Sequence, residues 1–302
     1  MVSNPNATAT TARERDVLAH ALGSASDLEI VETANRGHAA ALACRAMRDG
    51  VDVVVALGGD GTVNEVVNGL LTDGVHDRVP ALGIVPAGST NVFARALGLP
   101  DDRIEATGAL LEGMRTGSRR AVSLGMVDER WFVFGASVGY TAAVVDRVER
   151  HRRRGTRSTH TLYARLAVRE FFRTDRRNPK LHLELSDGTT HDDVYFLIVA
   201  NSDPWTYVGN RPLRPTPGVT LDTDLALYAR RRMNPLGLLL SMSRLSGARP
   251  RVSNRGAHVA HDLQTVTVRA DEPMPVEVDG DYLEPREKLV FRSAPEALRV
   301  VL

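Results

Sequence analysis

The chain has 302 residues, 43% of them hydrophobic, and its formal net charge at pH 7 is +1. This length can bury the cores of two ordinary domains, and the near-neutral balance excludes a uniform polycation. The single cysteine, Cys44, rules out an internal disulfide. No apolar run approaches the roughly 20 residues of a membrane span, and no charged segment followed by an apolar one opens the chain, so we expect a cytoplasmic protein.

The first 120 residues alternate predicted strands and helices. In order, the expected elements are 2–3, 12–22, 28–31, 38–49, 51–57, 63–71, 82–85 and 103–114. Strand and helix in turn are typical of a doubly wound parallel sheet. Only three residues precede Asn4, where a strand usually has about five or six, which favours a natural start further upstream.

The most informative segment follows the apolar residues 51–57, which read as a strand buried on both faces. Gly58, Gly59 and Gly61 let the backbone turn sharply and approach a ligand, and a helix expected to begin at Thr62 would aim its free N–H groups at that turn. Phosphate could bind such amides. A carboxylate at Asp60 would repel phosphate but could hold Mg²⁺. A tight strand-to-helix connection without any ligand is the alternative interpretation.

A second turn repeats the arrangement at residues 81–95. An apolar strand leads into Pro86, Ala87 and Gly88, and the hydroxyl of Ser89 is predicted to cap the next helix. Because ligands of open parallel sheets bind beyond the carboxyl ends of the strands, we expect both turns to face the same ligand.

After residue 120 the pattern becomes rich in short strands. We expect strands at 121–127 and 130–136, a hairpin of 180–186 and 193–200, and several short strands over 264–301. Asp279-Gly280-Asp281, taken alone, is an ordinary hairpin turn.

The strongest charge feature is the arginine-rich segment 146–180. Apolar residues and arginines interleave at 160–173, which predicts an amphipathic basic helix. It could be the solvated face of a core-packed helix, or an interfacial element that attracts anionic lipid headgroups. Nucleic-acid binding is less favoured, because no aromatic stacking platform accompanies the charge.

Together these segments resemble the diacylglycerol kinase catalytic family, which includes sphingosine kinases and bacterial lipid kinases. The matching pieces, in the family's order, are Asn4-Pro5-Asn6-Ala7-Thr8, Thr33, Gly58-Gly59-Asp60-Gly61-Thr62-Val63-Asn64, Gly88-Ser89-Thr90-Asn91-Val92-Phe93-Ala94-Arg95 and Asp279-Gly280-Asp281. NAD kinases and phosphofructokinases share the string Gly-Gly-Asp-Gly-Thr. The turn at Gly88, with Asn91, Phe93 and Arg95, is what selects lipid kinases.

The resemblance implies an ATP-binding α/β domain over residues 1–120, completed by about 293–302. It also implies a β-rich, sandwich-like domain for the lipid substrate over 121–292, with the active site in the cleft between the two. The implied reaction transfers the γ-phosphate of MgATP to a lipid hydroxyl, first of all that of diacylglycerol, to give phosphatidic acid.

The resemblance also assigns roles to residues. ATP would lie against Asn4, Pro5, Asn6, Ala7, Thr8, Thr33, Gly58, Gly59, Asp60, Gly61, Thr62, Val63, Asn64, Gly88 and Ser89. Asp60 would hold Mg²⁺, and Asp281 would accept the proton of the attacking hydroxyl. A second, structural Mg²⁺ would use Asp222, Asp224 and the carbonyl of Val219.

Several alternatives stay open. The acceptor could be a sphingoid base or another lipid, and an NAD kinase-like enzyme shares the glycine turn. A catalytically inactive nucleotide-binding protein is a further option, because Val92, Ser123 and Thr141 stand where relatives carry acids. The expected partners are ATP and a lipid at the anionic inner face of a membrane, without nucleic acid. The oligomeric state stays open, with a homodimer as one option.

Overall fold

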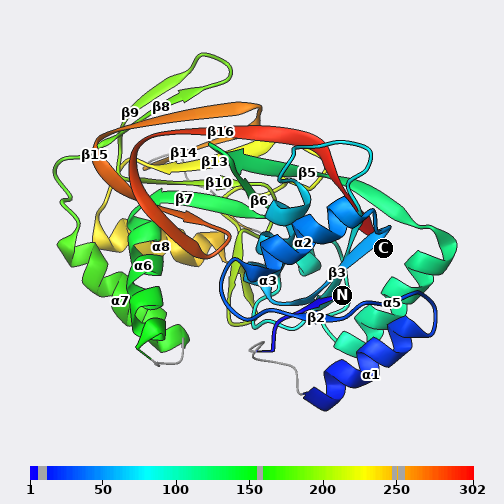
Figure 1. Cartoon of the computed structure of the whole chain (residues 1–302). Coiled ribbons are helices and arrows are strands. Elements are labelled where there is room, and N and C mark those ends of the chain that lie inside the picture. The colour runs from blue at the N-terminus through cyan, green and yellow to red at the C-terminus, as the bar shows by residue number, and fades with distance from the viewer. Residues whose placement is uncertain (6–11, 155–158, 247–249, 251–255) are drawn as a thin grey trace. The chain divides into compact units, whose positions relative to one another are not determined.

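The computed structural model describes residues 1–5, 12–154, 159–246, 250 and 256–302 (Figure 1). These residues form two compact units, one of Met1–Leu124 with Pro295–Leu302 and one of Gly125–Ala294. Strands β5 (Arg119–Val127) and β16 (Asp281–Val301) contain the points where the chain passes between the units. None of the described helices is long and apolar enough to cross a membrane.

The first unit is built on a parallel sheet. Its strands run in the order β2 (Val31–Glu32), β1 (Val2–Ser3), β3 (Val53–Gly58), β4 (Ala81–Pro86) and the end of β16. All four neighbouring pairs are parallel, and β3 pairs with β4 from Val53↔Ala81 to Gly58↔Pro86. The predicted parallel sheet is therefore confirmed. Its strand order changes direction between β1 and β3, the kind of switch point at which open sheets bind ligands.

Helices pack against this sheet. They are α1 (Ala12–Gly23), α2 (His38–Asp49), α3 (Asp60–Leu70), α4 (Val92–Ala96) and α5 (Arg103–Thr116). Leucines of α1 and α5 share one core with Val55, Leu57 and Val301. Helices α2 and α3 cross so closely that a Cβ on Gly69 would overlap the backbone carbonyl of Ala40.

The second unit is mainly antiparallel. Its central strands run in the order β14 (Ala257–Leu263), β13 (Leu225–Arg230), β10 (Phe196–Ala200), β7 (Gly135–Gly139), β15 (Thr265–Val278) and β16. The smaller strands are β6 (Arg130–Phe132), β8 (Leu181–Leu185), β9 (Thr190–Val194), β11 (Thr206–Val208) and β12 (Arg211–Leu213). Helices α6 (Tyr140–Arg153), α7 (His160–Arg173) and α8 (Pro235–Leu245) also belong to this unit. Together, the two units have the mixed α/β fold expected from the sequence.

Three predicted elements of the second unit were wrong. The strand expected at 130–136 is two strands, β6 and β7, because the N–H groups of Val133, Phe134 and Gly135 donate to the carboxylate of Asp279 instead of to a neighbouring strand. The strand expected at 193–200 is divided between the end of β9, which contains Asp193 with a φ of 62°, and β10, which pairs with β7 and β13. Residues 264–301 form two long, bulged strands, β15 and β16, rather than several short ones.

Two boundaries in the first unit also differ from the prediction. Helix α3 begins at Asp60, not at Thr62, so the acid lies in the first helical turn. Ser89 does not cap α4. The N-cap residue is Asn91, whose φ of 49° is left-handed and places the helix start at Val92.

Candidate functional site in the first unit

Three segments predicted to bind nucleotide meet at the carboxyl ends of β1, β3 and β4. The backbone N–H of Asn4 donates to the carbonyl of Leu57 at 3.2 Å. The Asn4 side-chain amide donates to the Thr62 hydroxyl at 3.3 Å. Across the next strand, the N–H of Ala87 donates to the carbonyl of Gly58 at 2.8 Å. The parallel register therefore gathers the segments at one edge of the sheet, as the sequence predicted.

Close packing explains three of the glycines at this edge. A Cβ on Gly58 would lie 2.5 Å from the Thr62 hydroxyl oxygen, and a Cβ on Gly88 would lie 2.6 Å from the Cα of Gly59. A Cβ on Gly59 would in turn lie 3.0 Å from the Cα of Gly88. The two turns thus touch backbone to backbone, and this contact requires glycine whether or not a ligand binds.

Gly61 is different, because no atom lies within 4 Å of the position that its Cβ would occupy. It is the second residue of α3, and its φ is not left-handed. The N–H groups of Thr62 and Val63 donate to the carbonyl of Gly59 at 2.9 and 3.1 Å. The amides of Asp60 and Gly61 have no acceptor within the helix, because the first residues of a helix lack a preceding turn. Open surface beside helix-start amides is the arrangement that binds phosphate.

Asp60 ties the two turns together. Its carboxylate accepts the backbone N–H of Phe93, in the first turn of α4, at 3.3 Å. Burial raises the pKa of Asp60 to about 6, and the N–H groups at the start of α4 together with Arg95 oppose that rise. The carboxylate is therefore mostly ionised at neutral pH. It could serve a cation while also fixing α4.

Two residues at this edge have structural roles that were not predicted from the sequence. The Asn91 side chain accepts the N–H of Gly88 at 2.9 Å and donates to the carbonyl of Gly88 at 3.1 Å, so it holds the second turn closed. Glu65, on α3, accepts the N–H groups of Gly37 and Ala39 at 2.8 and 3.1 Å and caps α2. The role of Asn91 could have been predicted from its residue type, because asparagine tolerates a left-handed φ at a helix start better than most residues.

The other residues predicted to bind the nucleotide differ in whether their side chains are exposed. Thr33 lies beside the end of β1, where its N–H donates to the carbonyl of Ser3 at 2.9 Å. The side chains of Val63 and Asn64 are buried, so we assign them to packing. Ser89 is exposed, with its hydroxyl 3.5 Å from that of Thr90.

The remaining predicted nucleotide-binding residues lie near the start of the chain. Pro5 lies in the turn after β1. Asn6, Ala7 and Thr8 lie outside the described residues.

In the second unit, the acids around the turn at Gly280 have different surroundings. Asp279 is buried and accepts three backbone N–H groups, those of Val133, Phe134 and Gly135, at 2.7, 3.0 and 3.1 Å. Asp281, the predicted base, keeps 21% of its side chain exposed and lies 3.7 Å from the guanidinium of Arg130. Asp279 therefore shapes the turn, and Asp281 is the acid that a ligand could reach.

Glu277 is a buried acid that sequence reasoning missed. Its carboxylate accepts the Ser137 hydroxyl at 2.7 Å and the N–H of Gly280 at 2.5 Å. Burial raises the pKa of Glu277 to about 7, and the nearby charges of Asp279 and Asp281 add to that rise. It is a positioning residue beneath the turn, since only 2% of it is exposed.

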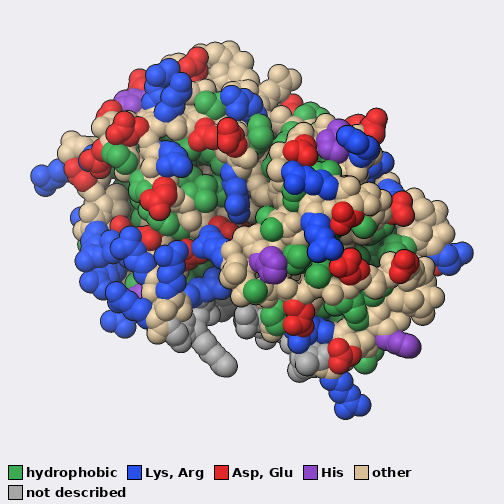
Figure 2. Space-filling view, in the orientation of Figure 1, with side chains coloured by type: hydrophobic (Ala, Val, Ile, Leu, Met, Phe, Trp, Pro, Cys, Tyr) green, Lys and Arg blue, Asp and Glu red, His purple; other side chains and the backbone are tan. Residues whose placement is uncertain are grey.

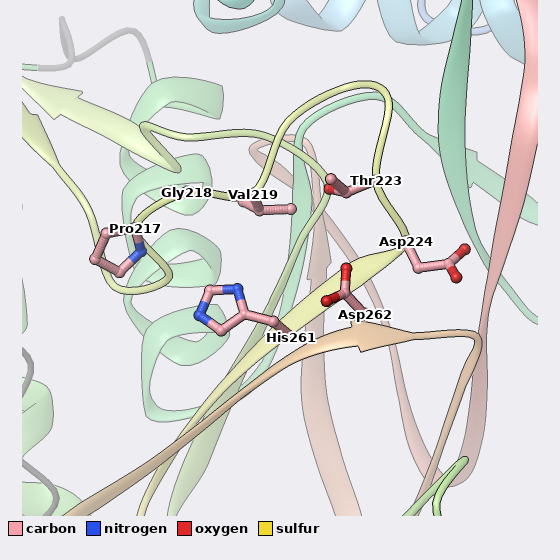
Figure 3. Close-up of a pocket in the computed structure, with 7 residues that line it drawn as sticks. All are labelled: Pro217, Gly218, Val219, Thr223, Asp224, His261 and Asp262. Atoms are coloured by element: carbon pink, nitrogen blue, oxygen red, sulfur yellow. The ribbon is translucent and has the colours of Figure 1, made fainter.

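Two of the three residues predicted to hold a second Mg²⁺ line a pocket of about 290 Å³ in the second unit (Figure 3). Val219 and Asp224 line it, together with His261 and Asp262. The N–H of Asp222 donates to the Thr220 hydroxyl at 3.3 Å within a self-bonded turn. Across the described ranges, no three His, Cys, Asp or Glu side chains gather in position to hold a metal ion.

Residues 1–127 match the family model of the diacylglycerol kinase catalytic domain. A diacylglycerol kinase of Staphylococcus saprophyticus is 39% identical over 108 residues, which are 36% of this chain and 33% of that protein. For a diacylglycerol kinase of Staphylococcus aureus the identity is 40% over 108 residues, 36% of this chain and 32% of that protein. The chain thus spans about a third of the length of the curated relatives it matches.

Solved structures show the same fold over the whole chain. A diacylglycerol kinase from Bacillus anthracis superposes with a TM-score of 0.73 at 18% identity, covering 99% of this chain and 94% of that one. An NAD kinase from Archaeoglobus fulgidus, solved in complex with ATP, superposes with a TM-score of 0.54 at 11% identity, covering 100% and 92%. The chain therefore shares its fold with these solved structures beyond the residues that the family model matches.

Proposed function

We propose that the protein is an ATP-dependent lipid kinase that transfers the γ-phosphate of MgATP to a lipid hydroxyl, that of diacylglycerol first. The observation that carries this proposal is the edge of the first unit, where Gly61 leaves open surface beside the first amides of α3, which have no acceptor within the helix. The match of residues 1–127 to the diacylglycerol kinase catalytic domain supports the same reaction.

The triphosphate would bind at this edge. The amides of Asp60 and Gly61 would donate to phosphate oxygens, helped by the positive end of α3. Asn4, Thr33, Thr62 and Ser89 would contribute from the neighbouring strand ends, as would Gly58, Gly59 and Gly88 through their backbone. Asn6, Ala7 and Thr8 would continue the first of these turns.

Asp60 would hold Mg²⁺. A carboxylate is the ligand type that Mg²⁺ prefers, and this one is ionised above a pKa of about 6. When bound, the ion would offset the negative charge of the phosphate groups. We propose the second cation, at Val219, Asp222 and Asp224, only as a structural site.

Asp281 would act as the base. As the lipid oxygen forms its bond to the γ-phosphorus, the bond from that phosphorus to the β–γ bridging oxygen breaks, ADP leaves, and the hydroxyl proton passes to the Asp281 carboxylate. Arg130, 3.7 Å away, would keep that carboxylate oriented. The partial exposure of Asp281 supports this choice over Asp279 and Glu277, which are buried and hydrogen-bonded within the unit.

The lipid substrate would be met at an anionic membrane surface, with the protein bound peripherally to the inner face of the membrane. Arg165, Arg169 and Arg173 support this, because all three are exposed on α7 and could bind acidic headgroups.

The test is an acceptor competition with the purified full chain and radiolabelled ATP. Diacylglycerol in mixed micelles, a sphingoid base and NAD would be offered side by side, and the labelled product identified by mass spectrometry. We expect labelled phosphatidic acid, and its loss in both Asp60→Asn and Asp281→Asn. Labelled NADP would favour an NAD kinase instead, a candidate suggested by the shared fold. Nucleotide binding without any transfer would favour the inactive alternative.

A further inference from the structure

Helix α8 carries leucines on two opposite faces. Its inner face packs Leu238 and Leu245 into a core that also contains Phe171 of α7. Its outer face exposes Leu236 by 67%, Leu239 by 69% and Leu240 by 44%. The spacing i, i+3, i+4 places these three side chains on one stripe, directed away from the core.

Such a stripe is unusual for a helix on a protein surface, whose outer face is normally polar. Isolated exposed leucines are ordinary, but a contiguous group of them marks a contact with another apolar phase. Met242, 41% exposed, continues the apolar surface toward the end of the helix. Within α8 the only charged residue is Arg244, in the last turn.

The charged residues around α8 indicate the charge of its partner. Between Asp224 and Asp262 the chain contains seven arginines and no aspartate, glutamate or lysine. Arg231 and Arg232 are exposed just before the helix, and Arg244 is exposed at its end. An apolar stripe bracketed by arginines fits a partner that is apolar inside and anionic at its surface.

Helix α7 extends this surface. It packs into the same core as α8, through Phe171, and its outer side exposes Val168 by 59% and Phe172 by 66%. Arginines flank these two residues, and Figure 2 shows the Lys and Arg side chains gathered over α6 and α7. The two helices thus cover the same face of the second unit's sheet and both present apolar side chains among basic ones.

We infer that α8, with α7 beside it, inserts its leucine stripe into the acyl layer of an anionic bilayer while the flanking arginines bind headgroup phosphates. Eleven residues of helix are about 16 Å long, too short to span a hydrocarbon core of about 30 Å, so α8 lies in the plane of the interface. This inference rests on the proposed function in one respect: a lipid substrate is the reason that the protein would bind a membrane.

Two other occupants fit the surface less well. A second copy of the chain, paired through α8 about a two-fold axis, would bring one arginine-rich surface against another. Nucleic acid would satisfy the arginines but leave the leucine stripe in water. Both occupants predict outcomes that the experiment below distinguishes.

The test is sedimentation of the full chain, without ATP, with vesicles of phosphatidylcholine alone or mixed equally with phosphatidylglycerol. The double variant Leu239→Ser, Leu240→Ser should bind mixed vesicles about tenfold or more weakly, because two side chains lose their apolar burial. Ile104→Ser is the matched control, since Ile104 is 73% exposed on α5 of the first unit and should not affect binding. Arg231→Gln with Arg232→Gln should weaken binding to mixed vesicles several-fold and leave binding to phosphatidylcholine unchanged.

Each opposite result overturns the inference. Unchanged vesicle binding by the leucine variant would exclude α8 as the inserted element. If the wild type were a dimer and the leucine variant a monomer that binds vesicles equally well, the stripe would contact a second copy of the chain instead. Preference for duplex DNA over mixed vesicles would assign the arginines to nucleic acid.

Activity on a short-chain diacylglycerol dispersed in detergent separates this inference from the proposed function. We expect that activity to be unchanged in the leucine variant. Vesicle binding by a protein without kinase activity would refute the proposed function alone, and kinase activity without vesicle binding would refute this inference alone.

Discussion

Replacing Gly61 with alanine separates the two interpretations of the glycine turn. If the turn is only a tight connection, Gly61→Ala should leave activity intact, because no atom lies within 4 Å of the added Cβ. If the turn binds phosphate, the added methyl group occupies the surface that the phosphate approaches, and ATP binding should weaken.

The structure sets the expected size of both effects. Gly61 lies in α3 with a φ that alanine can adopt, so the substitution should stabilise the fold by up to about 1 kcal/mol through helix propensity. For a chain of 302 residues, that corresponds to a rise of up to about 1.6 °C in the thermal midpoint. A lost phosphate contact of about 1.4 kcal/mol or more would raise the KM for ATP about tenfold or more. Stability and binding should therefore move in opposite directions.

The assay measures ATP dependence of lipid phosphorylation and the thermal midpoint on the same preparations. Gly108→Ala provides the matched control, because Gly108 is also helical, on α5, and has no atom within 4 Å of its missing Cβ. It should gain similar stability with an unchanged KM. Gly59→Ala should instead lower the midpoint, since its Cβ would press on Gly88. An unchanged KM in Gly61→Ala would refute the phosphate-binding interpretation of this turn.

Three further predictions concern groups around the two turns. Asp60→Asn should lose most turnover and yet be more stable than wild type at pH 7 by up to about 3 kcal/mol. The reason is that burial raises the pKa of Asp60 from 3.8 to about 6, so ionisation of this carboxyl lowers the stability of the folded state as the pH rises through that range. Unfolding by denaturant at a series of pH values checks this, and an advantage that persists below about pH 4 would contradict it. Glu277→Gln should likewise gain stability over wild type as the pH rises from 4.5 to about 7, where the pKa of Glu277 is raised by burial, and a pH-independent difference in thermal midpoint would count against that cause. Asn91→Ala should lower stability by roughly 1–3 kcal/mol and raise the KM for ATP, because it loses both hydrogen bonds to Gly88 and strains a left-handed position, and an unaltered melting curve would rule this role out.

Local signals explain what could be read from the sequence. The helix at 38–49 has the predicted bounds, because an alanine-rich segment is closed by left-handed Gly37 and Gly50. Register explains the site in the first unit, since parallel strands must deliver Asn4, Gly58 and Gly88 to one edge. Both depend on residue types and spacing that are visible in the chain.

Contacts between residues that are far apart in the chain explain the features that the sequence did not predict. The break at Val133 depends on a carboxylate 146 residues away, at Asp279, which no local pattern reveals. The bond from Phe93 to Asp60 likewise joins residues 33 apart. Helix α8 was not predicted, although the signals for its start are local. The side chain of Asn234 accepts the N–H of Gly237 at 2.5 Å, and Pro235 occupies the first turn. Its leucines lie on two opposite faces, so the helix lacks the single apolar face by which a helical period is recognised.

The central claim is that the turn from Gly58 to Thr62 holds the phosphates of a nucleotide, and a crystal structure of the full chain with magnesium and a non-hydrolysable ATP analogue tests it most directly. We predict phosphate oxygens within hydrogen-bonding distance of the amides of Asp60 and Gly61, with the cation on the Asp60 carboxylate. Density for the analogue at any other part of the chain, with these amides facing only solvent, would contradict the claim.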